Sequence, residues 1–515
     1  MNRSIMQAHP QSRQPVAMLC AFSIAAFSVV LAGCNVGPKY LPPTMTAPAA
    51  FKESSAQITE TGQWFVAQPQ DAAIHGKWWE IYNDPELNVL EDELNIDNQN
   101  IRQAFEDFMQ ARAVVREARS QYFPIVSVGG SHTRSQASSN VGSKAGTGVA
   151  VGQPTQVFSF PADVSWEPDL WGRVRNTVRA SQYAAQLSAA DLENVRLTEQ
   201  ASLAQFFFEL RGQDALQKIL DDTVEADKKS LQISSTRYDN GIDDQISVVQ
   251  ARTTLESAQS AAIDIGIARA QYEHAIATLI GKPASTFSIQ VGSLTGVPPS
   301  IPAGVPSQLL ERRPDIAAAE RNMAAANAQI GVAYAAYYPN LMLSASGGLE
   351  SSAIKHILDW PSRFWSVGPS ISETVYDGGL RRATVNQYIA TYNANVSAYR
   401  QSVLAAFQQV EDSLASVRIL SQQVVRQQEA VDSSRTFLRL QMGRYETGID
   451  PYIDVLAAQT TLLSNQQSLA VLQVQRMTAS VQLIESLGGG WDRSQLPPPA
   501  QITQKPTGAE TDLQH

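Results

Sequence analysis

The stretch RYDNGIDDQISVV, from Arg237 to Val249, returns 207 positions later as RYETGIDPYIDVL, from Arg444 to Leu456. Each copy places a glycine, Gly241 or Gly448, after a long run of mixed polar and apolar residues and follows it with Ile and Asp. Glycine readily adopts the left-handed conformation that ends a helix, and an acidic residue favours the first turn of the next helix. Each copy therefore predicts a tight turn between two helices.

The match between the two copies extends over most of the chain. The same offset pairs three further positions, Gly172 with Gly379, Arg175 with Arg382 and Gly281 with Gly488. Upstream the offset becomes 215, which aligns YFP at 122–124 with YYP at 337–339, so the change falls within the Ser-, Gly- and Thr-rich segment 132–156. Such a segment is typical of a loop whose length differs between repeats. The chain is predicted to contain two copies of one unit, residues 78–300 and 301–490.

Each unit is predicted to have the same order of elements: a helix, two strands, a long helix, the glycine turn and a second long helix. Apolar and polar residues alternate in the strand-like runs, and a period of two is typical of strands between unlike environments. The predicted leading helices and strands are 87–119, 125–130 and 157–166 in the first unit, and 317–336, 341–347 and 364–375 in the second.

The long helix of the second unit carries a strict heptad, which indicates a left-handed coiled-coil seam. We expect this helix to span Arg381–Met442, on the order of 90 Å at ~1.5 Å per residue, and its less regular counterpart to span Arg173–Tyr238. The residues that recur every seven positions are Ile389, Val396, Val403, Val410, Val417, Val424, Val431 and Leu438.

Four amphipathic strands of about ten residues suit a membrane β-barrel but cannot close one, because open sheet edges do not occur in lipid. The barrel must then be shared between chains. Two chains would give eight strands and a filled interior, whereas three would give twelve strands and an open lumen. Long helical hairpins on every strand pair favour the trimer. A small soluble sandwich beside an ordinary helix bundle is the alternative.

Residues 1–33 are predicted to be an export signal. Arg3 and Arg13 precede the apolar stretch 17–32, which leads into LAGC ending at Cys34. A basic start, a short apolar stretch and small residues before a cleavage site are typical of secreted proteins. The LAGC ending resembles the lipobox of bacterial lipoproteins, so Cys34 is predicted to carry lipid and residues 34–77 to form a lipidated N-terminal segment. Asn35 is not the Asp that keeps such lipoproteins in the inner membrane, so the outer membrane is favoured over secretion with an incidental cysteine.

Several function classes find no support in the residues. The net charge is −10 and no run of five basic residues occurs, so nucleic acid is not an expected partner. The six histidines are scattered without metal-ligand spacing, and neither a nucleophile elbow nor a phosphate-binding glycine loop is present. We therefore expect no enzyme activity, no metal and no cofactor.

At this point the chain resembles the TolC-like outer-membrane efflux proteins, specifically the NodT-type lipoprotein branch. The resemblance rests on seven segments in order: CNVGPKYLPP (34–43), WWEIYNDPEL (78–87), QYFP (121–124), EPDLWGRVR (167–175), LLERRPDI (309–316), VYDGG (375–379) and RYETGID (444–450). It implies a trimeric twelve-stranded transmembrane barrel on a periplasmic helical tunnel. It also implies a passive exit duct that works with a periplasmic adaptor and an inner-membrane transporter, often of the resistance-nodulation-division class.

The resemblance places both glycine turns at the periplasmic end of the tunnel, where the channel closes and an adaptor docks. An acidic ring there favours cations. Asp450, before Pro451, suits a helix N-cap, and one of Asp243 and Asp244 should cap likewise, which leaves Asp454 as the gate candidate. The remaining candidates of the tips are Gly241, Gly448, Arg237, Arg444, Tyr238 and Tyr445, with the Ile after each glycine expected to make the apolar contact of the turn.

This chain departs from its relatives at one point of the gate. Family members often read Leu-Asp-Ala-Gln where this chain has LAAQ at 456–459, so Ala457 removes part of the usual constriction. The second hairpin, with its extra acid, is predicted to be the moving part. A periplasmic coiled-coil structural or adaptor lipoprotein is the alternative function. The tail, residues 491–515, is predicted to be disordered because it contains three consecutive prolines and few apolar residues.

Overall fold

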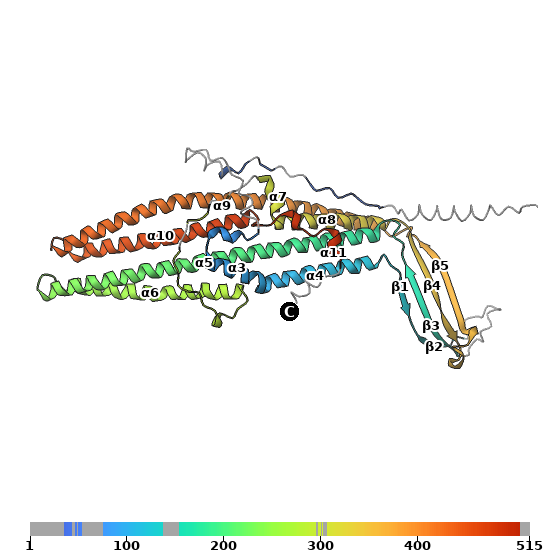
Figure 1. Ribbon diagram of the computed structural model, residues 1–515. Helices are drawn as coiled ribbons and strands as arrows, with labels where there is room; N and C mark the ends of the chain where they lie inside the picture. Colours follow the sequence, from blue (N-terminus) through green and yellow to red (C-terminus); the bar gives the residue numbers. More distant parts are fainter. Residues whose placement is uncertain are drawn as a thin grey trace, which may run out of the picture.

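The computed structural model describes residues 35–43, 47–48, 50–53, 76–136, 138, 154–294, 297–299, 301 and 306–504. The molecule is elongated, with a curved sheet at one end and the tips of two helical hairpins at the other (Figure 1). The predicted signal 1–33, the lipidation site Cys34 and residues 505–515 lie outside the described residues.

The two hairpins are the longest elements. The first joins α5 (Arg173–Asp239) to α6 (Gln245–Leu279), and the second joins α9 (Leu380–Glu446) to α10 (Tyr452–Ser486). Both long arms have 67 residues and both short arms have 35, as a duplicated unit requires. The heptad residues Val403, Val410 and Val431 are buried, and the others of that series on α9 are at least half-buried. The predicted seam is therefore confirmed in α9.

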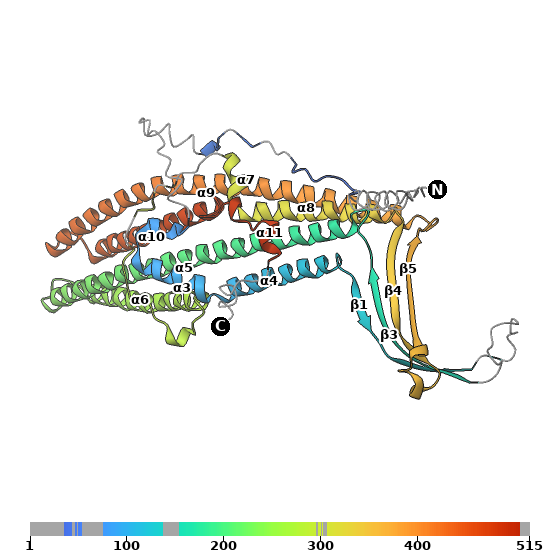
Figure 2. The ribbon, with the colours of Figure 1, turned by 45° about the vertical axis from the view of Figure 1, so that its right-hand side comes forward.

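Shorter helices continue the line of each short arm toward the sheet (Figure 2). In the first unit these are α3 (Pro85–Asp97) and α4 (Gln99–Ser120), separated at Asn98, whose side chain caps α4 and also donates to the carbonyl of Leu279 at 2.8 Å. In the second unit the helix is α8 (Pro314–Ala335). Gly281 and Gly488 end the short arms with positive φ. A Cβ on Gly281 would clash with the Asp97 backbone at the junction of α3 and α4, and a Cβ on Gly488 would clash with the Arg312 backbone just before α8, which explains the glycine in both units.

The sheet is antiparallel in the order β1-β3-β4-β5, with β2 also paired to β3. Its strands are β1 (Ile125–Val128), β2 (Ser131–Ser135), β3 (Thr155–Trp166), β4 (Asn340–Ser351) and β5 (Arg363–Ser372). β3 joins β4 with Phe158 opposite Ser351 and Trp166 opposite Leu343, so the two units meet in one sheet. Among the described residues β1, β2 and β5 each have one neighbouring strand, and both edges of the sheet stay open.

Several strand boundaries differ from the prediction. One strand was expected over 341–347, but β4 continues to Ser351 because residues 348–351 stay paired with β3. The first strand was expected over 125–130, but it ends at Val128 and resumes as β2, because Gly129 and Gly130 interrupt the ladder and Gly130 lies against the Phe160 ring, where a side chain would crowd it. The last strand was expected to reach residue 375, but it ends at Ser372 because Glu373 and Thr374 turn back to bind the Arg381 guanidinium.

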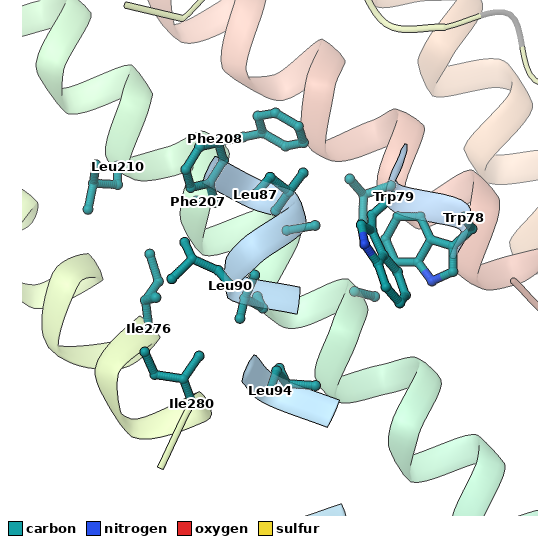
Figure 3. Packing of buried hydrophobic residues seen from close by; sticks show 14 of the residues in the cluster. Trp78, Trp79, Leu87, Leu90, Leu94, Phe207, Phe208, Leu210, Ile276 and Ile280 are labelled. Carbon is teal, nitrogen blue, oxygen red and sulfur yellow. The ribbon is translucent and has the colours of Figure 1, made fainter. Parts of the chain in front are cut away.

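The main core lies midway along the tunnel helices and is built largely by the first unit. Trp78 and Trp79 of η2 (Trp78–Tyr82) and leucines of α3 pack against α5 and α6 (Figure 3). Burying each such side chain stabilises the fold by about 1.5–3 kcal/mol. The largest fully buried members are Trp78, Leu87, Leu94, Leu203, Phe207, Leu210, Ile276 and Ile280.

The prediction of a disordered tail is wrong for residues 491–504. Trp491 is buried, and the chain then forms η7 (Arg493–Gln495) and α11 (Pro499–Ile502), whose Ile502 is fully buried against Val115 and Ala185. Arg112 donates to the carbonyl oxygens of Gln501 and Gln504. Few apolar residues suffice because the two that matter, Trp491 and Ile502, enter grooves already formed by α4, α5 and α8.

The N-terminal segment lies on the outside of α5, α8 and α9. It begins at Asn35 beside Gly172, where Val36 N–H donates to the Trp171 carbonyl at 3.2 Å. Further along, Tyr40 binds the Glu320 carboxylate and Phe51 is buried among α9 and α10 residues. The remaining short helices are η3 (Ala284–Thr286), η4 (Pro306–Gln308), α7 (Leu309–Arg312), η5 (Ile354–His356) and η6 (Trp360–Ser362).

Candidate functional site at the hairpin tips

Both glycine turns have the predicted left-handed conformation. Gly241 has φ 73° and Gly448 has φ 78°. In each turn the glycine N–H donates to the carbonyl three residues back, and the following Ile N–H donates to the carbonyl five residues back, all at 2.9 Å. This bonding satisfies the last carbonyl groups of α5 and α9. The expected apolar contact is wrong, because the side chains of Ile242 and Ile449 are 63% and 65% exposed.

If the chain is the efflux duct that the resemblance implies, replacing Gly448 by valine should impair efflux, because a β-branched residue strains the left-handed turn at the tip. Drug resistance of a strain that depends on this protein is the measurement, with trimer levels checked in the same cells. Gly443→Ala is the matched control, since Gly443 is helical and a Cβ there meets nothing. Full resistance with normal trimer levels in Gly448→Val would contradict the prediction.

Tyr445 and Asp243 join the two hairpins. The Tyr445 hydroxyl donates to Asp243 Oδ2 at 2.7 Å and lies 3.1 Å from the Ser234 hydroxyl of α5. The Tyr445 ring is fully buried and packs on Tyr452 with ring centroids 5.5 Å apart. Tyr445 belongs to the second hairpin and Asp243 to the first. The pair therefore connects the two tips within one chain.

Asp243 is held as a carboxylate. Burial alone would raise its pKa, but hydrogen bonds from Tyr445, Ser247 and the Asp244 N–H, together with the nearby Arg237 charge, outweigh burial and lower the pKa. The Ser247 hydroxyl donates at 2.9 Å, and Arg237 Nε lies 3.6 Å from Asp243 Oδ2. Near neutral pH the two tips are therefore joined by hydrogen bonds to a negatively charged carboxylate.

Arg237 makes the second link between the hairpins. Its Nη1 donates to the Glu446 carbonyl at 3.1 Å, at the end of α9, and its guanidinium lies 4.7 Å from the centre of the Tyr445 ring. A cation at a helix C-terminus and over an aromatic face is favoured on both counts. Arg237, Asp243 and Tyr445 thus form one cluster, which we call the tip lock.

The prediction that Asp450 caps α10 is wrong. Pro451 occupies the N-cap position with extended backbone, and no side chain caps this helix. The Asp450 carboxylate instead receives Arg444 Nε at 2.5 Å and Nη2 at 2.7 Å, and this pairing lowers its pKa. The helix starts one residue later than expected, so Asp450 is free to pair within its own turn. The prediction that either Asp243 or Asp244 caps α6 is confirmed for Asp244, whose side chain accepts from the Ser247 N–H at 3.0 Å.

The remaining candidates stand apart from the tip lock. Asp454 is half-buried in the first turn of α10 and accepts no hydrogen bond from the described residues, although its charge acts on Arg444. Tyr238, which corresponds to Tyr445 in the first unit, is 45% exposed, and no described residue bonds its hydroxyl. The two copies of the turn therefore share a backbone but not a role for their tyrosines.

A buried polar seam between the hairpins, above the tip lock, was missed by the sequence analysis. Asp227, Ser230 and Ser234 lie on one face of α5 against Tyr452 and Gln459 of α10. Gln459 donates to the Ser230 hydroxyl at 2.9 Å, whereas Asp227 Oδ2 is buried and has no hydrogen-bond partner among the described residues. The available signal was the i, i+3, i+7 spacing of these polar residues, which puts them at seam positions where apolar side chains are expected.

Burial raises the pKa of the Asp227 carboxyl to about 6, and burial together with the Asp227 charge raises the pKa of Tyr452 to about 12. In the part of the chain that the structure describes, no group of three or more His, Cys, Asp or Glu side chains is placed to hold a metal ion. Nor does any helix of that part have the length and apolar character to cross a membrane.

The comparisons with known proteins agree with this architecture. The family model described as "Outer membrane efflux protein" matches residues 90–282 and 305–489. Outer membrane protein OprJ of Pseudomonas aeruginosa is 30% identical over 490 residues, covering 92% of this chain and 96% of OprJ. The structure of the outer-membrane channel OprN superposes with a TM-score of 0.80 at 28% identity, covering 89% of this chain and 100% of that chain.

A further solved structure, described as the open state of the Neisseria gonorrhoeae MtrE outer membrane channel, has a TM-score of 0.75 at 25% identity and covers 89% of this chain and 99% of that chain. The chain belongs to the outer membrane efflux protein family. The predicted resemblance to the TolC-like efflux proteins, the combination of tunnel helices with an antiparallel sheet, and the role as an outer-membrane component of efflux are confirmed. Proteins of this family are components of transport systems.

Proposed function

We propose that three copies of the chain form the exit duct of a tripartite efflux system, with their sheets closed into one twelve-stranded barrel. The open edges of the sheet support this assembly most directly. β1 and β2 at one edge and β5 at the other present unpaired backbone groups, and pairing one chain's β5 with the next chain's β1 satisfies both. The sheet also exposes Trp365, Val367 and Ile371 on one face of β5, as a lipid-facing strand requires.

The two family-matched segments support a division into two units, 78–300 and 301–490. We place the docking surface for a periplasmic adaptor at the tips, where both turns expose apolar residues. The adaptor joins the duct to an inner-membrane transporter, which we assign to the resistance-nodulation-division class and which supplies the energy. No catalytic step is assigned to this chain, and the adaptor-like lipoprotein alternative is disfavoured because such a protein needs no apolar sheet face.

The tip lock is proposed to hold the duct shut. Opening requires the second hairpin to leave the first, which breaks the Tyr445–Asp243 bond and the Arg237 bond to Glu446. The MtrE structure described as open supports the view that this architecture has two states. We further propose that Asp454, half-buried but without a hydrogen-bonding partner among the described residues, contributes a ring of three acids that favours cations at the aperture.

Lipidation at Cys34 fits the place where the described chain begins. Asn35, the next residue, lies at the junction of helices and sheet, beside Trp171, which stacks on Tyr338 with ring centroids 4.8 Å apart. Trp and Tyr are enriched at the level of membrane headgroups. An acyl chain on the preceding residue would therefore be attached near the level of the membrane headgroups.

The duct is tested by purifying the full chain and measuring both assembly and conductance. We expect a trimer that survives detergent, dissociates on heating and forms cation-preferring pores in planar bilayers, with the preference reduced in Asp454→Asn. A monomer that forms no pores would overturn the proposed function. Pores with unchanged selectivity in Asp454→Asn would remove only the acidic ring.

Lipidation has its own test. The mature chain should begin at Cys34, and its mass should include a thioether-linked diacylglycerol and an N-acyl group. The Cys34→Ser variant should lack both groups while the trimer still forms. An unmodified N-terminus in the mature wild-type chain would show that this assignment is wrong.

A further inference from the structure

An open cavity of about 380 Å³ lies at the junction of helices and sheet, one turn before the first strand begins. The end of α4, the start of α5 and α11 line it. The lining side chains at and just after the end of α4 and on α5 are Arg119, Tyr122, Arg175, Arg179 and Gln182. Three arginines around one tyrosine are unusual in a chain whose net charge is −10.

Two of the three arginines have no acidic partner among the described residues. Arg175 pairs with Asp169, with Nε 3.0 Å from Oδ2. Arg179 makes one long contact of 3.4 Å to the Asn176 side-chain oxygen, and neither Arg119 nor Arg179 forms an ion pair within the described residues. Burial and the Asp169 charge raise the pKa of Tyr122, and all three arginines oppose that shift, which places their charges within reach of one hydroxyl.

The cavity lies at the level where the helices meet the sheet. Tyr122 is fixed to the sheet because Trp166, the last residue of β3, donates its indole N–H to the Tyr122 carbonyl at 3.1 Å. Phe123 and Ile125, which follow, are exposed apolar residues that lead into the strand. Trp166, Trp171 and Tyr338 surround the same level, as in the aromatic belt of membrane proteins.

The cavity also lies near the N-terminal segment. Arg179 contacts Asn176, and the Asn176 amide donates to the carbonyl of Val36 at 3.3 Å, in the N-terminal segment. That segment runs along the outside of the helices, and the C-terminal α11 closes the other side of the cavity. Arg179 is therefore connected, through Asn176, to the segment that follows the proposed lipid anchor.

We propose that this cavity binds the phosphate-bearing headgroup of an anionic phospholipid in the inner leaflet of the outer membrane. Arg119 and Arg179 contact the phosphate, the Tyr122 hydroxyl donates to it, and Phe123 lies along the first methylenes of the acyl chain. Guanidinium groups suit phosphate oxygens because their N–H groups bind two at once, and basic pockets at the membrane surface select anionic lipids. The proposal rests on the proposed duct, since it needs the sheet to be in a bilayer.

The second unit provides a matched control. Arg382 corresponds to Arg175, is exposed at the same height on α9 and has no ion pair among the described residues. Tyr334 stands where Arg119 stands in the first unit, and Asn386 where Arg179 does. The cluster of three arginines thus belongs to one unit only, which predicts three such sites in a trimer.

The test titrates the purified full-length trimer in neutral detergent with phosphatidylglycerol, with phosphatidylcholine and with inorganic phosphate, counting bound lipid by native mass spectrometry. We expect up to three phosphatidylglycerol molecules per trimer, with affinity reduced roughly 10- to 30-fold in the variant Arg119→Gln/Arg179→Gln, at about 1 kcal/mol per arginine. Arg382→Gln should bind as the wild type does.

Equal affinity of the double variant and the wild type for phosphatidylglycerol would overturn the proposal. If inorganic phosphate competed with the lipid at the same concentration, the cavity would be a site for soluble anions and not a lipid site. If the double variant does not assemble, the single variants Arg179→Gln and Tyr122→Phe are tested in its place. Pore formation by the double variant in planar bilayers separates a failure of this site from a failure of the proposed duct.

Discussion

Tyr445→Phe should open the duct. The substitution keeps the buried ring but removes the hydroxyl that donates to Asp243 at 2.7 Å and meets Ser234 at 3.1 Å. A partly buried hydrogen bond to a charged group stabilises a structure by about 1.5–3 kcal/mol, so we expect the ratio of open to closed tips to rise roughly 10- to 100-fold. Asp243→Asn should act in the same direction, because it also removes the charge that faces Arg237.

Single-channel conductance in planar bilayers and sensitivity of cells to a large antibiotic that the outer membrane excludes are the two measurements. Both should increase in Tyr445→Phe. Tyr238→Phe is the matched control, because it makes the same change at the corresponding position of the first unit, where the hydroxyl has no partner among the described residues. Wild-type conductance in Tyr445→Phe would mean that the tip lock does not restrain the channel.

Acid should close the duct through Asp227. Burial raises the pKa of this carboxyl from 3.8 to about 6 in the packed seam, and the side chain is only 2% exposed. Well below pH 3.8 the carboxyl is neutral whether the hairpins are together or apart, so packing it carries no charge penalty. As the pH rises from 4 to 6 the separated state loses its proton first, and the stability of the closed seam falls.

The expected size follows from the pKa shift. If separation returns Asp227 to water, the shift from 3.8 to about 6 weakens closure on the order of a hundredfold between acid and neutral pH. Asp227→Asn should keep the tips together at pH 7 and flatten the pH dependence of conductance, whereas Asp222→Asn, an exposed neighbour on α5, should not. An unchanged pH profile in Asp227→Asn would contradict this prediction.

The periodic features of the chain were predictable from sequence because each depends on local residues. The heptad of α9 gave the seam, and Gly241 and Gly448 gave the turns, since a left-handed position leaves few alternatives to glycine. The offset between the repeats placed the difference in length within 132–156, of which the structure describes mainly β2 and the start of β3. Periodicity and backbone conformation need no knowledge of what lies across the fold.

The chemistry of the tips was less predictable because it depends on contacts between distant residues. Asp243 and Asp450 occupy corresponding places in the two copies, yet Asp243 binds Tyr445 of the other hairpin and Asp450 binds Arg444 of its own. Equally, the tail was ordered by two apolar residues whose grooves arise only after α4, α5 and α8 have packed. Composition could not distinguish such a segment from a mobile one.

The equal lengths of the two hairpins constrain how a tunnel of this kind can change its reach. Because the α9 seam repeats every seven residues, an insertion of any other size in that arm would turn the apolar positions beyond it away from α10. The tip lock needs both turns at one height, so the first hairpin must lengthen by the same amount. Periplasmic depth is therefore adjustable only in steps of about 10 Å, one heptad at ~1.5 Å per residue, taken by all four arms together.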